Sequence, residues 1–221
     1  LTLSITEMYK FLINNKDRIK EDVRDALASI DSDPQFAFGL SIEEKTFYFP
    51  KECLFTYDKG SKNQDIAERN VYESYLMSAE PRSSGERQFE LYCENPNSNV
   101  EWWYKNGDKG GEYLSIVYTD NSGKQKAFYP DYLVAVKKAD GTVDFSVIEV
   151  KGGMSANTND DIDRYSAKKH AILKNYCEKQ GLHGGFVRFD KDLQMLVMCD
   201  FEHEYSDDGS DGNWQLLRDA F

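Results

Sequence analysis

The sequence predicts a mixed α/β fold, in which a sheet of antiparallel and parallel strands is flanked by helices. Three observations lead to this prediction. Apolar alternation interrupted by short polar turns runs through residues 100–151, which is typical of successive β-strands. Segments with helical periodicity lie on either side of that region, at 83–94 and 160–180. Two further strand patterns, at 184–190 and 193–200, follow the second helix.

Residues 1–80 are expected to form an N-terminal extension that packs on the core. Apolar residues recur at helical spacing between residues 5 and 30, which predicts a long opening helix. The segment 45–58 is aromatic and β-prone but contains Pro50, so an edge strand or a pair of short strands is expected there. Residues 70–77 are expected to form a short helix.

The core is expected to span residues 81–201, with an acidic tail at 202–221. Its first helix begins at a capping box, in which Ser83 and Glu86 can each bind the other's backbone N–H group. Gly181 ends the second helix. Four successive strands are expected between the two helices: 100–105, 112–119, 126–136 and 143–151.

The most informative stretch, residues 129–153, places three charged residues at one edge of a predicted hairpin, with its turn at 139–141. Asp131 stands near the start of one strand. Glu149 and Lys151 lie two apart on the next strand, so strand periodicity points both to one sheet face. Two carboxylates held this close repel each other unless a hard divalent cation lies between them. Mg²⁺ favours such carboxylates together with phosphate and water oxygens, so the arrangement predicts a metal ion and a phosphate substrate.

This order of motifs resembles the active-site signature of the PD-(D/E)xK nucleases. Pro130 and Asp131 are followed, after a strand and a turn, by Glu149-x-Lys151. The order of a glutamate-bearing helix, WYKN, YPD and IEVKG is similar to the nuclease domain at the C-terminal end of type III restriction enzyme Res subunits and related superfamily 2 helicases. The similarity covers about residues 70–200. It implies a restriction-endonuclease-like fold and a Mg²⁺-dependent endonuclease that hydrolyses phosphodiester bonds of DNA, with Mn²⁺ as an alternative ion.

The resemblance also implies roles for the residues of this site. Asp131, Glu149 and the Val150 carbonyl would hold the metal. Lys151 would orient or activate the attacking water and offset charge in the transition state. Recognition of a particular DNA sequence would depend on another part of the protein, because this chain shows no motif that reads bases.

Glu86 matches a further acid that the family places on its first helix, where it touches the metal directly or through water. Its place in the capping box offers a purely structural role, and both roles are compatible. Glu90, one turn further on, is the alternative metal ligand. In the strand that follows, the aromatic residues at 102–104 could form a platform on which bases stack, but most of them are expected to pack in the core. Lys105 and Asn106 are expected to lie near phosphate.

The second helix carries basic residues beside Tyr165, namely Arg164, Lys168 and Lys169. A related nuclease branch has a Gln-x-x-x-Tyr motif in this element, and this chain has no such glutamine. Which side chain of this helix grips the DNA backbone is therefore left open. A solvated helix face is the default interpretation.

The balance of charge limits how the chain can meet nucleic acid. Lysine and arginine number 27 against 39 acids, which gives a net charge of −12. Such a polyanion repels DNA at long range, so tight autonomous binding is not expected. A nuclease module delivered to DNA by a helicase or ATPase portion, of the same or a partner polypeptide, agrees with this charge. A methyltransferase subunit is a further expected partner.

Two other functions use the same features. A catalytically silent binding module could keep the fold in order to dock a helicase or methyltransferase partner, and the acidic surface favours it. The intact set of Asp131, Glu149 and Lys151 opposes it, because a silent module has no need of repelling carboxylates. A nuclease acting on RNA or on Holliday junctions would use the same chemistry on another substrate.

Composition indicates a soluble, cytoplasmic protein. The sequence contains no run of about 18 apolar residues and no basic segment followed by a hydrophobic one at its start, so neither a membrane span nor a signal peptide is expected. The chain begins at Leu1 without an initiator methionine, which fits a fragment or a trimmed chain. Reduced, mostly buried thiols are expected at the four widely spaced cysteines, Cys53, Cys93, Cys177 and Cys199.

Overall fold

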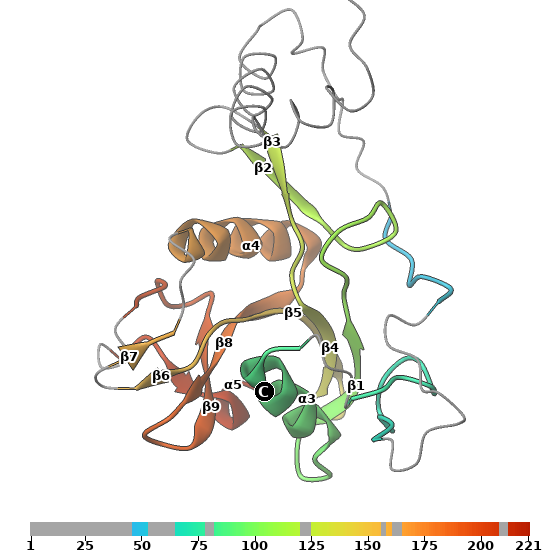
Figure 1. Ribbon diagram of the computed structural model, residues 1–221, viewed down its shortest axis with the longest axis horizontal. Coiled ribbons are helices and arrows are strands. Elements are labelled where there is room, and N and C mark those ends of the chain that lie inside the picture. The colour runs from blue at the N-terminus through green and yellow to red at the C-terminus, as the bar shows by residue number, and fades with distance from the viewer. Residues whose placement is uncertain are drawn as a thin grey trace, which may run out of the picture. The chain divides into compact units, whose positions relative to one another are not determined.

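The computed structural model describes residues 46–52, 65–77, 82–119, 125–155, 158–160, 165–207 and 212–221. They belong to one compact unit, Thr46–Phe221. Within these residues, an eight-stranded mixed sheet and a two-stranded sheet pack with helices (Figure 1). The predicted α/β class, a mixed sheet flanked by helices, is confirmed. The helix predicted at 5–30 lies outside the described residues.

The centre of the large sheet has an α-β-β-β-α-β order of elements. Helix α3 (Ser84–Glu94) precedes three antiparallel strands, and helix α4 (Ser166–Gln180) then leads to a fourth strand that is parallel to the third. A helical crossover of this kind is how two parallel strands are normally joined. The four neighbouring strands are β1 (Val100–Lys105), β4 (Tyr132–Lys137), β5 (Val143–Val150) and β8 (His183–Asp190).

The remaining strands of the large sheet extend it beyond β8. They are β6 (Met154–Ser155), β7 (Thr158–Asn159), β9 (Met195–Asp200) and β10 (Gln215–Leu216). Helix α5 (Leu217–Ala220) follows β10. Trp214 and Leu217 are buried, so part of the segment that composition marks as an acidic tail is built into the core.

The strand predicted at 126–136 is in fact two strands in two sheets. Strand β3 (Gln125–Phe128) pairs with β2 (Ile116–Thr119) in the small sheet, whereas β4 belongs to the large one. Pro130 lies at the break. Proline has no N–H to donate to a strand ladder, so the ladder is interrupted there. The Pro130 carbonyl instead accepts a hydrogen bond from Asn106 Nδ2 at 2.9 Å. The break places Asp131 directly before β4.

Residues 70–77 do not form the predicted helix. Their backbone instead binds the edge strand β1, where the Val71 N–H donates to the Trp103 carbonyl at 3.0 Å and the Trp103 N–H donates to the Arg69 carbonyl at 3.1 Å. Tertiary pairing has overridden a weak local helical preference. No strand is present in the described part of the aromatic segment, 46–52.

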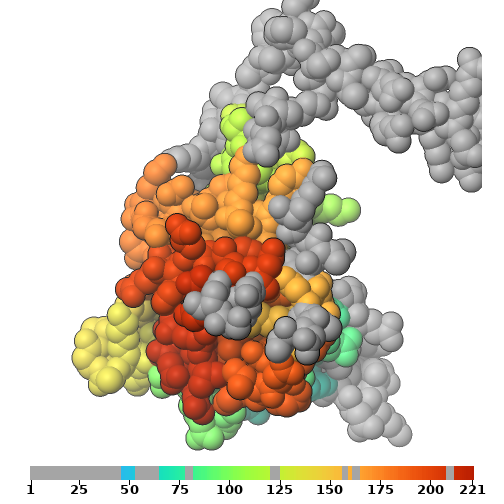
Figure 2. Space-filling view, turned by 90° about the vertical axis from the view of Figure 1, so that its left-hand side faces the viewer, coloured from blue at the N-terminus to red at the C-terminus, as the bar shows by residue number. Residues whose placement is uncertain are grey.

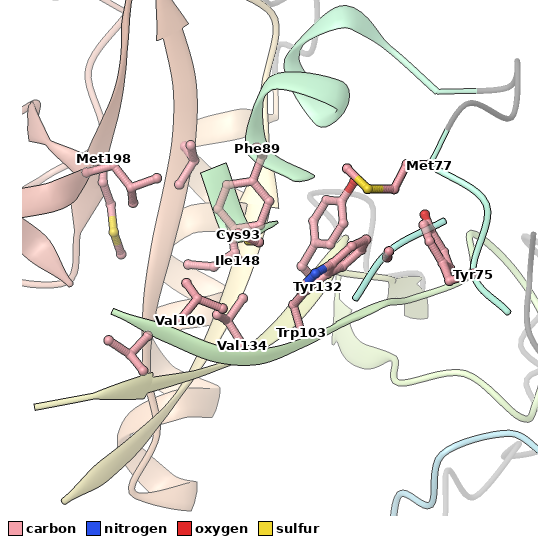
Figure 3. Close-up of a cluster of buried hydrophobic side chains, with 14 residues drawn as sticks. Tyr75, Met77, Phe89, Cys93, Val100, Trp103, Tyr132, Val134, Ile148 and Met198 are labelled. Atoms are coloured by element: carbon pink, nitrogen blue, oxygen red, sulfur yellow. The ribbon is translucent and has the colours of Figure 1, made fainter. Parts of the chain in front are cut away.

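Two layers of apolar side chains pack on the two faces of the sheet. Helices α3 and α5 lie on one face, and α4 with the β2–β3 hairpin lies on the other (Figure 1). Ile148 faces the first layer with Phe89 of α3 (Figure 3), and its neighbour Val147 faces the second with Leu173 of α4. The alternation along β5 that the sequence predicts therefore separates the two layers.

Part of the C-terminal segment, including Tyr205 and Trp214, completes the layer beneath α4, whereas Leu217 belongs to the layer of α3. In Figure 2 the red C-terminal segment lies beside the orange surface of α4. Tyr205 contacts both the His170 ring of that helix and Trp214. The three described cysteines, Cys93, Cys177 and Cys199, are buried, reduced thiols, as predicted. Among the described helices, none has the length and apolar character required to cross a bilayer.

Candidate functional site

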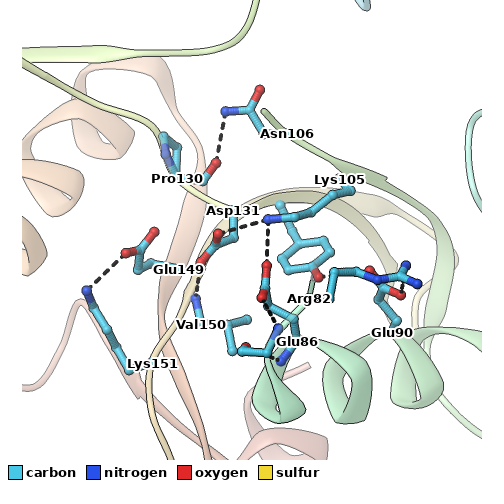
Figure 4. Close-up of polar contacts among 12 residues, drawn as sticks. Arg82, Glu86, Glu90, Lys105, Asn106, Pro130, Asp131, Glu149, Val150 and Lys151 are labelled. Atoms are coloured by element: carbon cyan, nitrogen blue, oxygen red, sulfur yellow. Dashed lines mark hydrogen bonds and ion pairs between the residues drawn. The ribbon is translucent and has the colours of Figure 1, made fainter. Parts of the chain in front are cut away.

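The predicted site residues meet at the edge of the sheet where β4 begins and β5 ends (Figure 4). Asp131 directly precedes β4, Glu149 lies on β5 and Lys151 follows that strand. Glu86 comes from the first turn of α3. The structure thus brings together all the side chains that the sequence analysis assigns to the site, and Asp131 lies between Glu149 on one side and Lys105 on the other.

Strand register fixes how the two central acids face each other. Tyr132 is paired with Ile148 in the antiparallel β4–β5 ladder, so the next residues outward, Asp131 and Glu149, come opposite each other. Asp131 Oδ2 accepts a hydrogen bond from the Val150 N–H at 2.8 Å. Both the ladder and this bond hold the Asp131 carboxylate against the end of β5.

Glu149 is a buried carboxylate that lacks a full set of partners. Its side chain is 10% exposed, and its Oε1 lies 3.0 Å from Lys151 Nζ. Its Oε2 is buried and has no hydrogen-bond partner among the described residues. Burial and the neighbouring Asp131 charge raise the pKa of Glu149 to about 8, although Lys151 acts to lower it. The ionised form of Glu149 therefore needs more positive charge than the protein supplies.

Lys105 belongs to this site as a partner of two acids, a role that the sequence did not predict. Its side chain is 3% exposed, and its Nζ lies 2.8 Å from Glu86 Oε1 and 2.9 Å from Asp131 Oδ1. Burial lowers the pKa of Lys105, but the charges of Asp131 and Glu86 outweigh that effect and raise the pKa above its usual range. Lys105 is thus a buried cation within the acid cluster. Its expected contact with a phosphate stays a prediction.

Asn106 is likewise buried, with 1% of its surface exposed. Its amide donates to the carbonyls of Leu114 and Pro130 at 2.8 and 2.9 Å. Its side-chain oxygen accepts from the Leu114 N–H at 3.1 Å. Asn106 therefore fixes the turn that presents Asp131, and its expected contact with phosphate stays a prediction.

Glu86 reaches the site because α3 approaches β5 closely. A Cβ atom on Gly85 would lie 3.2 Å from both the Lys151 carbonyl and Val150 Cγ1, so a side chain there would push the helix away. The predicted capping box is present: the Ser83 N–H donates to Glu86 Oε2 at 2.7 Å, and the Glu86 N–H donates to Ser83 Oγ at 3.2 Å. Burial acts to raise the pKa of Glu86, but Lys105 and Ser83 lower it overall.

Glu90, the alternative metal ligand, is committed to the core. Its carboxylate accepts hydrogen bonds from Arg82 Nη1 at 2.6 Å, Tyr75 Oη at 2.7 Å and Tyr132 Oη at 3.0 Å. Both of its oxygens are therefore used within the protein, on the far side of Lys105 from Glu149 (Figure 4). The structure gives Glu90 a packing role and leaves Glu86 as the helical acid at the site.

The loop after β5 is held by an arginine that the sequence analysis missed. Arg188 is fully buried, and its Nε donates to the Gly152 carbonyl at 2.7 Å. Its Nη2 donates to the Gly153 carbonyl at 3.4 Å and to Asn159 Oδ1, and its guanidinium lies 5.5 Å from the Trp214 ring centroid. A signal was available, because an arginine in the middle of an apolar strand must find buried acceptors.

Helix α4 brings basic side chains toward the same edge. Lys169 is near enough to Glu149 to lower the pKa of that carboxylate slightly. Its Nζ lies 5.5 Å from the Phe128 ring centroid, and Lys168 Nζ lies 5.9 Å from that of Tyr118. Arg164 lies outside the described residues.

In β1, the expectation of core packing is confirmed for two aromatic residues. Trp103 and Tyr104 are both buried, although they are neighbours in sequence. The register shift between Val100 and Trp102 breaks strict alternation at the start of this strand. Trp102 is half-buried and packs against Phe49.

The raised pKa of Glu149 can be tested by measuring the free energy of unfolding against pH in the absence of divalent ions. The folded chain keeps the Glu149 proton up to about pH 8, whereas the unfolded chain releases it near 4.5. The folded state binds more protons in this window, so stability is expected to fall as pH rises from about 4.5 to about 8. Urea unfolding in a chelator at several pH values would measure this slope. The slope is expected to be shallower in Glu149→Gln, and equal slopes in both chains would contradict the assignment.

No group of three histidine, cysteine or carboxylate side chains in the described ranges is arranged to hold a metal ion by itself. The donors at this edge nevertheless suit a hard divalent cation, because they are carboxylate and carbonyl oxygens. The unpartnered Glu149 Oε2 is the observation that shows a fit. Lys105 lies between the other two acids, so the three carboxylates do not converge on one point.

Comparison with known proteins gives one result. A family model described as the YagJ family matches residues 84–190, which is just under half of the chain and includes all the predicted site residues. That description states no activity. Searches of curated proteins and of solved structures gave no match.

Proposed function

We propose that this chain is a Mg²⁺-dependent endonuclease domain that hydrolyses phosphodiester bonds of DNA, as a nuclease module of a helicase-nuclease of the type III restriction kind. One observation carries the proposal. The buried Glu149, whose Oε2 has no hydrogen-bond partner among the described residues, lies opposite Asp131 and 3.0 Å from Lys151. A carboxylate in such surroundings is costly to folding, and a strongly perturbed carboxylate beside a specific charge partner marks a candidate functional site. The resemblance to the PD-(D/E)xK nucleases adds the reaction class.

Each residue has a part in this proposal. Asp131, Glu149 and the Val150 carbonyl would hold the ion, and Mn²⁺ would substitute for Mg²⁺. The chemistry that a bound Mg²⁺ supplies is polarisation of the phosphate and a lowered pKa of water. Lys151 offers a compact ammonium group beside these ligands, where it can donate to a phosphate oxygen as negative charge builds up and can hold the attacking water.

The acidic surface bears on how the substrate arrives. With a net charge of −12, the chain gains little from long-range attraction to DNA. Lys168 and Lys169 supply local positive charge on the α4 side of the site. The proposal therefore includes a helicase portion, of this or a partner polypeptide, that raises the effective concentration of DNA at the site. A methyltransferase subunit is a further proposed partner.

Metal-dependent cleavage is the experiment that tests this function. The chain is incubated with supercoiled plasmid and with single-stranded DNA in Mg²⁺, Mn²⁺ or a chelator. We expect nicks in either ion, none in the chelator, and none with Asp131→Asn or Glu149→Gln. If native protein leaves both DNA substrates intact in both ions, the activity proposed for the isolated chain is wrong, and the silent binding module becomes the better account.

Divalent ions are also expected to stabilise the fold. A bound cation relieves the repulsion between Asp131 and Glu149, so millimolar Mg²⁺ or Mn²⁺ should raise the melting temperature. The Asp131→Asn variant removes one ligand and should show a smaller rise. If neither ion changes the melting temperature of the native chain, the result would argue against a metal site.

Affinity for DNA should be low for the chain by itself. We expect weak binding of duplex DNA at physiological salt, because few phosphate contacts can form against a net negative surface. Fluorescence anisotropy with a labelled duplex, measured over a range of salt concentrations, would test this. Nanomolar affinity for the isolated chain would contradict the delivery model.

A further inference from the structure

Lys105 divides the acid cluster into two unequal halves. On one side, its Nζ lies 2.8 Å from Glu86 Oε1 and 2.9 Å from Asp131 Oδ1. It also lies 4.8 Å from the Tyr132 ring centroid, so an aromatic face covers part of the ammonium group. The carboxylates contacted by Lys105 come from α3 and from the start of β4, and the lysine itself comes from β1.

The half of the cluster near Lys105 is saturated. Both oxygens of Glu86 have partners, Lys105 and the Ser83 N–H. The half near Glu149 is not, because Glu149 Oε2 has no partner among the described residues. Asp131 touches both halves, through Lys105 at Oδ1 and as the neighbour of Glu149 across the ladder.

Counting charges gives the same asymmetry. Counting only the groups that form these ion pairs, three carboxylates and the ammonium groups of Lys105 and Lys151 leave one net negative charge. That is enough to attract one divalent ion. A second one between Glu86 and Asp131 would have to displace a buried lysine whose charge already fills that position.

We propose that Lys105 takes the place of a cation between Glu86 and Asp131, so that a divalent ion binds only on the Glu149 side and Glu86 is not a direct ligand. Lys105 is then a positioning residue: it holds Asp131 in place and excludes metal from half of the cluster. This deepens the proposed function, because it concerns the same site. It also replaces the expected metal contact of Glu86 with a contact to Lys105.

The test is a double-mutant cycle in Mn²⁺ affinity, measured calorimetrically on the full chain. The four proteins are the native chain, Glu86→Gln, Lys105→Met and the double variant, and Asp131→Asn serves as the reference for loss of a ligand. Glutamine at position 86 preserves the capping box, so helix α3 keeps its start. Melting curves with and without Mn²⁺ establish that each variant folds.

We expect Glu86→Gln alone to weaken Mn²⁺ binding by less than about threefold, because Lys105 already neutralises Glu86. Lys105→Met should strengthen binding by about tenfold or more, since it removes a positive charge and frees two carboxylates. In that background Glu86→Gln should cancel most of the gain. The folded Lys105→Met variant should also depend more on Mn²⁺ for its melting temperature than the native chain does.

Several outcomes would overturn the proposal. One is a folded Lys105→Met variant with unchanged or weaker affinity, and another is an equal effect of Glu86→Gln in both backgrounds. If Lys105→Met does not fold, Glu86→Gln decides: a loss as large as that of Asp131→Asn means that Glu86 binds the ion. If the native chain binds no Mn²⁺, the proposed function fails, whereas the Lys105 proposal still requires Lys105→Met to gain binding.

Discussion

Replacing Lys151 with alanine is expected to slow DNA cleavage by about a hundredfold or more, the scale observed when a group that stabilises a transition state is deleted. Lys151 lies 3.0 Å from Glu149 and is 6% exposed, so its ammonium group is fixed beside the proposed ion ligands. Single-turnover cleavage of plasmid DNA in Mg²⁺ would measure the loss. Native-like cleavage by this variant would overturn the proposed mechanism.

The same substitution has a second effect that must be measured separately. Lys151 lowers the pKa of Glu149, so its removal makes that carboxylate harder to ionise. Metal-induced stabilisation should therefore persist in Lys151→Ala but require a higher pH than in the native chain. If the variant binds no ion at any pH, Lys151 mainly shapes the site. Lys138→Ala is a matched control, because Lys138 is about half exposed and lies at the turn end of the same hairpin.

A Gly184→Ala substitution is expected to cost about 4 kcal/mol or more of stability, or to prevent folding. Gly184 pairs with Val147 where the parallel strands β5 and β8 meet. A Cβ atom there would lie 2.1 Å from the Val147 carbonyl oxygen, and the backbone has a φ of +150°. The strands would have to separate next to the ladder that carries Glu149.

Gly141→Ala provides the control for this prediction. Gly141 also has a positive φ, +87°, but a Cβ atom would meet nothing within 4 Å. Only the backbone strain remains, which is about 1–2 kcal/mol. Urea denaturation of both variants compares the two costs. Similar values for both would mean that β5 and β8 can move apart to accept a side chain.

The sequence was sufficient to predict the parts of the site that depend on local pattern. Asp131, Glu149 and Lys151 lie on one hairpin, where a period of two residues determines which side chains share a face. The capping box of Ser83 and Glu86 is equally local and is present as predicted. The catalytic roles of these residues stay predictions until cleavage is measured.

The features that were missed depend on contacts between distant segments. The role of Lys105 follows from the pairing of β1 with β4, in which Lys105 is opposite Tyr132, and no local pattern fixes that register. Arg188 binds carbonyls 35 and 36 residues away along the chain. The sequence predicts one strand across Pro130 because apolar residues continue on both sides of it. A proline inside a predicted strand nevertheless indicates that the strand breaks there.

The ion pairs of Lys105 have a consequence for the order in which the molecule is completed. They join α3, β1 and the start of β4, with Asp131 lying 26 residues beyond Lys105 in the chain. Contacts between such distant segments form only after the intervening chain has closed into a loop. While a chain is still emerging from the ribosome, its acids therefore stay scattered. The ion-paired cluster at this edge is assembled only when α3, β1 and the start of β4 have come together.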